Sequence, residues 1–198
     1  TTSSIFSFGS LFAMRGAPPK CLVCDLDNTL WGGVVGEVGS SEIELSEDGI
    51  GRAYKDVQRE LLGLKKRGIL LALNSKNNWD DVAQVFREHP DMILRLEDFI
   101  SVRVNWANKV SNIREIAKEL NIGLDSLVFI DDNPNERELV RQLLPEVHTV
   151  DLPKDASLYR RTIEELSDFE LLALTKEDET RVAQYQAQSK RRAAKSTS

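Results

Sequence analysis

Five short apolar runs are spread along this chain, separated by longer stretches of mixed character. The runs have the length of buried strands and occupy residues 21–24, 69–73, 99–104, 126–130 and 147–150. Between them, apolar residues recur at the three- and four-residue spacing of amphipathic helices. These predicted helices cover residues 54–67, 78–89, 113–120 and 134–144. Strands that alternate with helices predict an α/β fold with an open, mostly parallel sheet flanked by helices.

Two regions depart from this alternation. Residues 36–49 contain glycines and the alternating sequence Glu-Ile-Glu-Leu at 42–45, which predicts a small hairpin flap after the first strand. After Asp151 the pattern is helical only, and a capping-box-like sequence at residues 175–178 opens the last helix. We therefore expect C-terminal helices after the last strand.

Composition divides the chain into three segments. Residues 1–19 are rich in Ser, Thr and Gly and are expected to be a linker or an N-terminal extension. Residues 20–189 contain all the predicted strands and are expected to form one catalytic domain. Residues 190–198 are a basic tail.

Overall composition excludes several classes of protein. The chain has 198 residues, of which 41% are hydrophobic and 29% charged, as is ordinary for one soluble globular domain. Its formal charge of −6 argues against a broad nucleic-acid interface. We expect no membrane association and no secretory signal, because no apolar run approaches the roughly 20 residues of a membrane span and the N-terminus lacks a signal pattern.

The two cysteines, Cys21 and Cys24, lie in the first predicted strand. Three steps along a strand place them roughly 10 Å apart on opposite faces. A disulfide needs Cα atoms within about 7 Å, and a zinc knuckle needs a second ligand pair, for which the chain has no further cysteine. Reduced thiols of a cytoplasmic protein are therefore expected.

Polar residues follow the first strand abruptly. Asp25 and Asp27 come directly after residues 21–24 and, if the strand continued, would share one side. Two carboxylates at the end of a buried strand are costly unless a cation or a charged ligand neutralises them. One carboxylate can then be a nucleophile or metal ligand and the other an acid/base. A calcium loop is the alternative, but an EF-hand loop needs Gly where this chain has Leu30.

Three further polar clusters follow the later strands. Ser75 ends the second strand and could bind a phosphoryl oxygen, although Ser or Asn here could equally cap the next helix. Lys76 could bind a second anionic group or simply be solvated. Lys109 stands at a predicted helix start, where a cation opposes the helix dipole, so a functional role is favoured. Asp131 and Asp132 end the fourth strand.

Four motifs in this order resemble the FkbH-like branch of the haloacid dehalogenase (HAD) superfamily. They are DLDNTLWGG at 25–33, SKN at 75–77, N-W-x-x-K at 105–109 and FIDDNPNER at 129–137. Receiver domains share an acidic pair, a phosphorylated Asp, a Ser/Thr and a Lys, but there the acidic pair comes first. The chain departs from the family at Asn108, where Pro is common, and at residues 36–39, where G-E-D-G is common.

The resemblance implies a HAD-like Rossmannoid fold with a minimal cap, and a role for each matching residue. Asp25 would attack a phosphate and become an aspartyl phosphate, and Asp27 would act as the acid/base. Mg²⁺ would bind the Asp25 carboxylate, the Asp27 backbone carbonyl and Asp132. We expect Ser75 to bind the phosphoryl group, Lys109 to neutralise charge, and Asp131 to orient Lys109.

The family also implies a reaction. FkbH-like domains resemble glyceryl transferase/phosphatases of polyketide synthase loading modules, so this chain could belong to a larger synthase. Such a domain takes 1,3-bisphosphoglycerate, holds the acyl group on a cysteine, removes the remaining phosphate and loads the phosphopantetheine thiol of an acyl carrier protein. Cys24 is the thiol nearest to Asp25. However, strand alternation turns Cys24 away from the site, and Cys21 lies about 13 Å back, so direct attack by the carrier thiol remains open.

Two other functions stay open from the sequence. One is a capless Mg²⁺-dependent HAD phosphatase of a small phosphoester or a phosphoprotein. The other is a non-catalytic docking domain, against which the intact set of acidic, Ser and Lys residues argues. The short stretch between the first two motifs leaves no room for a large cap domain, so we expect an open site.

Overall fold

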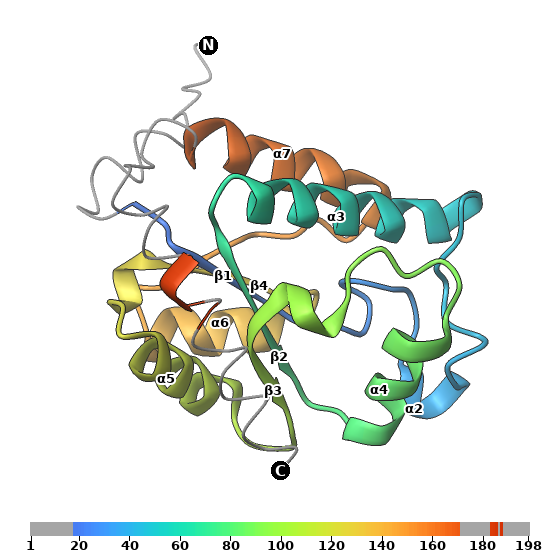
Figure 1. The fold of residues 1–198 in the computed structure, drawn as a ribbon, viewed down its shortest axis with the longest axis horizontal. Coiled ribbons are helices and arrows are strands. Elements are labelled where there is room, and N and C mark those ends of the chain that lie inside the picture. The colour runs from blue at the N-terminus through green and yellow to red at the C-terminus, as the bar shows by residue number, and fades with distance from the viewer. Residues whose placement is uncertain (1–17, 171–182, 186, 188–198) are drawn as a thin grey trace.

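The computed structural model describes residues 18–170, 183–185 and 187. Within them, five parallel strands form one sheet in the order β3-β2-β1-β4-β5 (Figure 1). The strands are β1 (Cys21–Cys24), β2 (Leu70–Ser75), β3 (Phe99–Val104), β4 (Leu127–Ile130) and β5 (His148–Thr149). The expected open parallel α/β sheet is therefore confirmed, and every described strand pair is parallel.

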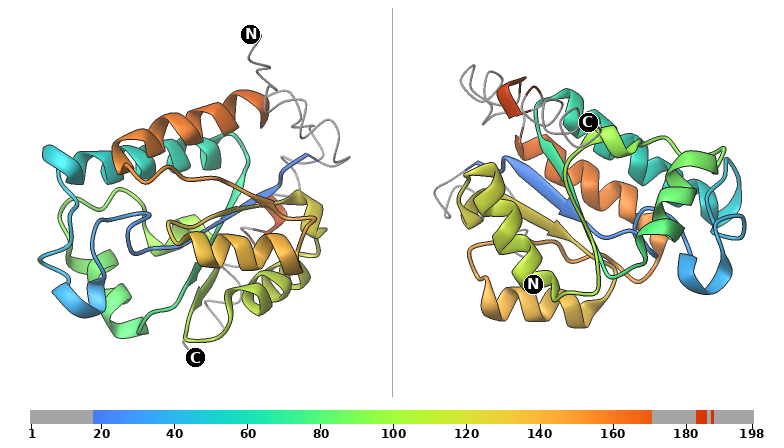
Figure 2. Two further views of the ribbon diagram at one scale, coloured as in Figure 1. Left: turned by 180° about the vertical axis from the view of Figure 1, so that it is seen from behind. Right: turned by 60° about the horizontal axis from the view of Figure 1, so that its bottom comes forward.

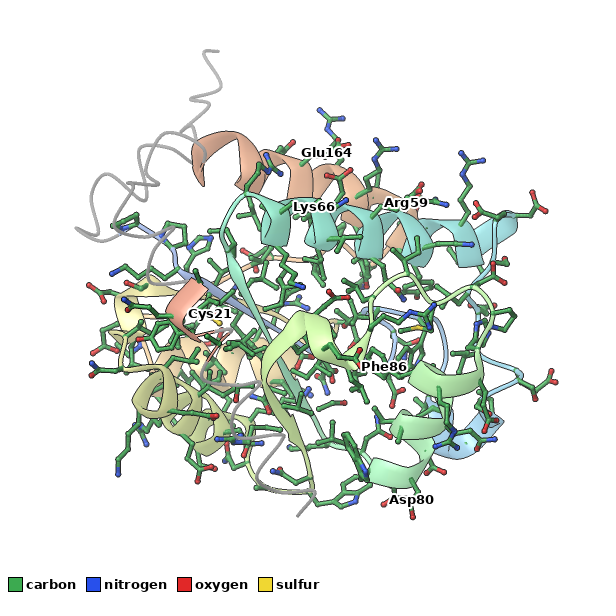
Figure 3. All side chains as sticks on the ribbon, in the orientation of Figure 1. Cys21, Arg59, Lys66, Asp80, Phe86 and Glu164 are labelled. Atoms are coloured by element: carbon green, nitrogen blue, oxygen red, sulfur yellow. The ribbon has the colours of Figure 1, made fainter. Side chains whose placement is uncertain are left out.

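Helices cover both faces of this sheet (Figure 2). They are α2 (Val35–Val38), α3 (Gly49–Lys66), α4 (Trp79–Glu88), α5 (Lys109–Leu120), α6 (Pro134–Leu143) and α7 (Tyr159–Glu170). The apolar residues of α3, α4 and α7 form one buried cluster with one face of the sheet, and those of α5 and α6 form a second cluster with the other face. In the first cluster, the ring of Phe86, labelled in Figure 3, belongs to α4. It packs edge-on against Trp31 and Phe99, with ring centroids 6.1 and 5.9 Å away.

Strand β1 is the centre of both clusters. Its four side chains are 0% exposed. Leu22 and Cys24 pack with the α3, α4 and α7 cluster, whereas Cys21 and Val23 pack with the α5 and α6 cluster. Burial on both faces explains why this strand is an unbroken apolar run.

The register of the sheet brings the ends of three strands together. Cys24 pairs with Leu73 of β2 on one side and with Ile130 of β4 on the other. β1 and β4 end at these positions and β2 ends two residues further on, at Ser75, so the three strands finish at the same edge of the sheet. Ligands of open α/β sheets bind at this carboxyl edge.

The predicted hairpin flap is wrong in its details. Residues 34–45 contain the short helix α2, and a single antiparallel bridge between Gly32 and Glu44 replaces a strand pair. Ile43 and Leu45 are buried as the alternating pattern indicated, but they anchor an extended segment to the core. Alternation reports which side chains are buried and does not require a neighbouring strand.

At the C-terminal end, α7 bears out the helical pattern expected after the last strand. The capping-box-like sequence at 175–178 and most of the two predicted terminal segments lie outside the described residues. Over the residues that the structure describes, no helix is both long enough and apolar enough to cross a lipid bilayer.

Candidate active site

Asp25 follows the last residue of β1 at the centre of the carboxyl edge. Its backbone N–H donates to the carbonyl of Ile130 at 3.0 Å, which ties it to β4. The chain then turns sharply, because the N–H groups of Thr29 and Leu30 both donate to the carbonyl of Leu26. Asn28 sits in this turn with a φ of 53°, a left-handed conformation that Asn tolerates better than most residues. Because β1 ends at Cys24, simple strand alternation does not extend to Asp27.

Lys109 reaches the Asp25 carboxylate from the first turn of α5. Its Nζ lies 3.0 Å from Asp25 Oδ2 and 2.5 Å from Asp131 Oδ2, and the residue is only 3% exposed. Asn108 caps α5 by accepting a hydrogen bond from the N–H of Val110 at 2.8 Å, so the Asn that replaces the family's usual Pro has a structural role here. Burial alone would lower the pKa of Lys109, but the charges of Asp25 and Asp131 and their hydrogen bonds raise it.

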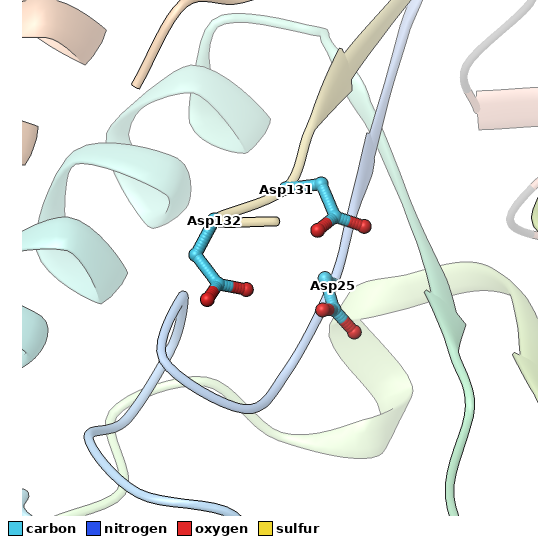
Figure 4. Close-up of side chains that lie close together, drawn as sticks. All are labelled: Asp25, Asp131 and Asp132. Atoms are coloured by element: carbon cyan, nitrogen blue, oxygen red, sulfur yellow. The ribbon is translucent and has the colours of Figure 1, made fainter. Parts of the chain in front are cut away.

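Three carboxylates converge beside this lysine. Asp25, Asp131 and Asp132 each place an oxygen within 4.8 Å of the others, as Figure 4 shows. Burial, together with the charge of Asp25, raises the pKa of Asp131 and raises that of Asp132 to about 6. A single lysine cannot balance three carboxylates, so the cluster keeps an excess of negative charge. Closely spaced hard oxygen donors with uncompensated charge fit a divalent cation such as Mg²⁺.

Asp27 lies outside this cluster and is held by three donors. Its Oδ1 accepts hydrogen bonds from Trp31 Nε1 at 2.9 Å and from the N–H of Val35 at 3.1 Å. Its Oδ2 accepts one from Asn77 Nδ2 at 2.8 Å. Burial raises the pKa of Asp27 and outweighs the opposing effect of these hydrogen bonds. A fixed carboxylate with a raised pKa is suited to acid/base work.

Ser75 ends β2 and is 1% exposed. It does not cap α4, because Asn78 occupies the N-cap position of that helix. Instead, its Oγ accepts a hydrogen bond from Asn77 Nδ2 at 3.2 Å. Asn77 thus joins Ser75 to Asp27, and this link between the second and first motifs was not predicted. The sequence signals for Asn77 were its place in the polar cluster at residues 74–78 and in the S-K-N motif.

A second network of side-chain amides holds the backbone of Lys109 in place, and the sequence did not predict it. Asn74 Nδ2 donates to the carbonyl of Lys109 at 3.0 Å, and Asn112 Nδ2 donates to Asn74 Oδ1 at 3.0 Å. Both asparagines are buried. Their partners lie 35 and 38 residues away along the chain, so no local pattern could reveal them.

The acidic pair is held through its backbone. Arg137 Nη1 donates to the carbonyls of Asp131 and Asp132 at 2.9 and 2.8 Å. Asn133 caps α6 and Pro134 occupies its first turn, as the sequence indicated. These contacts aim the two side chains differently, so that Asp131 meets Lys109 while Asp132 completes the acidic cluster.

Cys24 is the predicted site residue that the structure does not bring to the site. Its side chain is 0% exposed and packs in the α3, α4 and α7 cluster, where Sγ donates to the carbonyl of Ala72 at 3.6 Å. Burial and the neighbouring Asp25 raise the pKa of the Cys24 thiol. Cys21 is equally buried on the opposite face, and burial raises its pKa too.

A parallel sheet with a D-x-D aspartate, a serine, a lysine and an acidic pair at its carboxyl edge, in this chain order, has the architecture of HAD-type phosphatases. The chain belongs to the Acid Phosphatase family, whose model matches residues 17–165. No curated protein matches the chain significantly.

Solved structures share the fold of this chain. The N-terminal part of protein BF1531 from Bacteroides fragilis, described as containing a phosphatase domain and complexed with Mg, is 44% identical, with a TM-score of 0.74. The match covers 79% of this chain but only 42% of that one. A protein from Legionella pneumophila, described as a HAD superfamily subfamily III A hydrolase, has the same fold at 15% identity, a TM-score of 0.52, and coverage of 90% of this chain and 95% of its own. A hypothetical protein from Xanthomonas campestris is 16% identical, with a TM-score of 0.52 and coverage of 86% and 93%.

Proposed function

We propose that this domain is a Mg²⁺-dependent phosphatase that works through an aspartyl phosphate on Asp25. One observation carries the proposal: a buried lysine, Lys109, contacts Asp25 and Asp131 at the edge of the sheet where Asp132 completes an acidic cluster. The relative from Bacteroides fragilis, complexed with Mg, supports the choice of metal.

Each residue has a chemical task in this proposal. The Asp25 carboxylate attacks phosphorus, forming a new P–O bond as the bond to the leaving oxygen breaks. Asp27 gives its proton to that oxygen, then takes one from the water that attacks the aspartyl phosphate and frees Asp25 and inorganic phosphate. Ser75 hydrogen-bonds a phosphoryl oxygen, and Lys109 offsets the growing negative charge. Bound by Asp25 and Asp132, with the Asp27 carbonyl as the further predicted ligand, Mg²⁺ would supply additional charge neutralisation.

Replacing the nucleophile tests this function. Asp25→Asn keeps the shape of the side chain but removes the attacking anion, so hydrolysis of p-nitrophenyl phosphate should fall by about a thousandfold or more. Asp80→Asn is the control, because Asp80 lies exposed at the start of α4 (Figure 3). Full turnover in Asp25→Asn would contradict the proposal.

A finer proposal is the glyceryl transfer that the FkbH-like resemblance implies, from 1,3-bisphosphoglycerate to an acyl carrier protein. Its structural support is a pair of exposed indoles that lie close in sequence to Ser75 and Lys109. Trp79 and Trp106 are 48% and 68% exposed on the segments that follow β2 and β3. Exposed aromatics at a polar rim are typical of protein interfaces, and a carrier protein would need such a surface.

The buried thiols bear on the route of that transfer. Because Cys24 is buried with a raised pKa, direct attack of the carrier thiol on the acyl phosphate is the better-supported path. Incubation of the wild type with 1,3-bisphosphoglycerate, followed by peptide mapping, distinguishes direct attack by the carrier thiol from transfer through a cysteine. An adduct on Cys24 that Cys24→Ala abolishes would establish the cysteine route. If neither the domain nor any carrier protein is acylated, the phosphatase proposal stands alone.

A further inference from the structure

Tyr54 and Tyr159 lie beside one another, and the proposed reaction assigns neither of them a task. Tyr54 lies in the second turn of α3, and Tyr159 is the first residue of α7. Their rings pack edge-on, with centroids 6.1 Å apart and planes inclined at 84°. Both residues are almost fully buried, at 6% and 4% exposed. The packing of the two helices therefore holds both rings in place.

The fold brings this pair to the carboxyl edge of the sheet. Because α3 ends at Lys66, shortly before β2 begins, its first turns lie at the edge where β2 ends. The Tyr54 ring meets the loop that follows Asp25, since a Cβ added to Gly32 would lie 2.7 Å from Tyr54 Cε2. Cε2 is bonded to the carbon that carries the hydroxyl, so this is the hydroxyl end of the ring. Figure 4 shows α3, in pale blue-green, on the side of the acidic cluster where Asp132 lies.

The charge of Asp132 acts on both hydroxyls. Burial raises the pKa of Tyr54, and the charges of Glu44 and Asp132 raise it further. Burial also raises the pKa of Tyr159 to about 12, with contributions from Tyr54 and Asp132. Both phenols therefore stay protonated near neutral pH, and each can donate and accept a hydrogen bond.

Neither hydroxyl has a hydrogen-bond partner among the residues that the structure describes. Neither oxygen is sealed in the core, because the fully buried polar atoms that lack a partner belong to other residues. The third tyrosine of the chain differs, since the hydroxyl of Tyr185 donates to the carbonyl of Leu120. A tyrosine whose ring is buried usually finds a partner for its hydroxyl. The hydroxyls of Tyr54 and Tyr159 are therefore available to a ligand at the acidic cluster.

Asp132 needs a cation on this side of the cluster. Asp131 is paired with Lys109, whereas no described lysine or arginine forms an ion pair with Asp132. Arg137 donates to the backbone carbonyl of Asp132 instead. The two neutral phenols cannot balance this charge. Mg²⁺ keeps several of its water molecules when a protein binds it, and such waters donate hydrogen bonds to nearby oxygens.

We propose that Tyr54 and Tyr159 accept hydrogen bonds from water molecules of the Mg²⁺ that Asp132 binds, and so position the hydrated metal. The inference rests on the proposed function, because that function places Mg²⁺ at the acidic cluster. The two tyrosines are positioning residues, which touch neither the metal nor the reacting phosphoryl group. They determine how tightly the hydrated ion is held.

Calorimetric titration with Mg²⁺ in the absence of substrate tests this role. Tyr54→Phe and Tyr159→Phe each keep the edge-on ring pair and remove one hydroxyl. Each variant should raise the Kd for Mg²⁺ by about tenfold, and the double variant by more, because outer partners of a bound metal contribute on this scale. In EDTA, the urea midpoints of all three variants should equal that of the wild type, since neither hydroxyl has a protein partner.

Tyr185→Phe is the matched control. It removes a hydroxyl that has a protein acceptor, so it should lower the urea midpoint in EDTA and leave the Mg²⁺ affinity unchanged. Turnover of p-nitrophenyl phosphate separates positioning of the metal from contact with the substrate. In Tyr54→Phe and Tyr159→Phe, half-maximal activity should need about tenfold more Mg²⁺, while kcat at saturating Mg²⁺ should match that of the wild type.

Three results would overturn the inference: an unchanged Mg²⁺ affinity in the double variant, a lowered urea midpoint in EDTA, or a kcat that stays low at saturating Mg²⁺. The second result would make the hydroxyls structural, and the third would assign them to the substrate. Absence of turnover in the wild type would contradict the proposed function alone. The Mg²⁺ affinities would still decide the role of the two tyrosines.

Discussion

Replacing Lys109 with Met should destabilise the domain in a way that Mg²⁺ reverses. The change keeps most of the side-chain volume and removes an ammonium group that contacts both Asp25 and Asp131. With Asp132, these carboxylates would then form a mostly buried cluster of three acids without a cation. Repulsion among them would oppose folding unless another cation entered.

The magnitude follows from burial. Lys109 is 3% exposed and Asp131 is 0% exposed, so water screens their interaction poorly. Removing one partner of such a buried pair costs about 3–5 kcal/mol of unfolding free energy. Mg²⁺ at a hundred times its dissociation constant contributes about 2.7 kcal/mol to a native state that binds it. The variant should gain more than the wild type at equal Mg²⁺, because its acidic cluster has lost the competing ammonium group.

Urea denaturation of both proteins, with EDTA and with Mg²⁺, measures these terms. Lys65→Met is the matched control, since its partly exposed ion pair with Asp98 should contribute about 1 kcal/mol or less and show no dependence on Mg²⁺. If Lys109→Met unfolds at the wild-type urea concentration in EDTA, or if Mg²⁺ stabilises both proteins equally, the argument for a charge-balanced site fails.

Three further predictions concern the metal, the thiol and the flap. Asp132→Ala should raise the dissociation constant for Mg²⁺, measured by calorimetry, by more than about tenfold. It should also abolish turnover while the circular dichroism spectrum stays unchanged. Unaltered Mg²⁺ affinity would move the ligand role to Asp131. Cys24→Ala should lower the unfolding free energy, measured by urea denaturation, by about 1–2 kcal/mol, because the thiol packs in the core. It should leave kcat for p-nitrophenyl phosphate unchanged. A large loss of kcat would place this thiol in the reaction. Gly32→Ala should lower the unfolding free energy by about 1–3 kcal/mol, because the added Cβ would lie 2.7 Å from the ring of buried Tyr54. An unchanged melting temperature would show that the flap can shift to accommodate the methyl group.

The sequence predicted the sheet well because its strands are buried on both faces. A strand such as β1, with four fully buried side chains, leaves an unbroken apolar run that ends where the chain becomes polar. The face of Cys24 was predicted for the same reason, from alternation within that strand. The hairpin flap was wrong because Gly32 pairs with Glu44 through a single bridge, and four of the intervening residues, Val35–Val38, form α2.

The site was predictable where polar residues gather at or shortly after the end of a predicted strand. Asp25, Lys109 and Asp131 could be assigned roles from motif order, and the structure brings them together. Asn77 belongs to the S-K-N motif, but the motif did not reveal its contacts, and Asn112 belongs to none of the four motifs. Their function lies in hydrogen bonds to residues distant in sequence, and an asparagine in a polar loop has many alternative partners.

The most direct test of the account is to identify the residue that carries the phosphoryl group. Borohydride reduces an acyl phosphate of aspartate to homoserine, and peptide mass spectrometry locates the modified position. During turnover with Mg²⁺, we predict homoserine at position 25 and none at position 27, with no modification in Asp25→Asn. Homoserine at position 27, or sustained turnover with no reducible intermediate, would contradict Asp25 as the nucleophile.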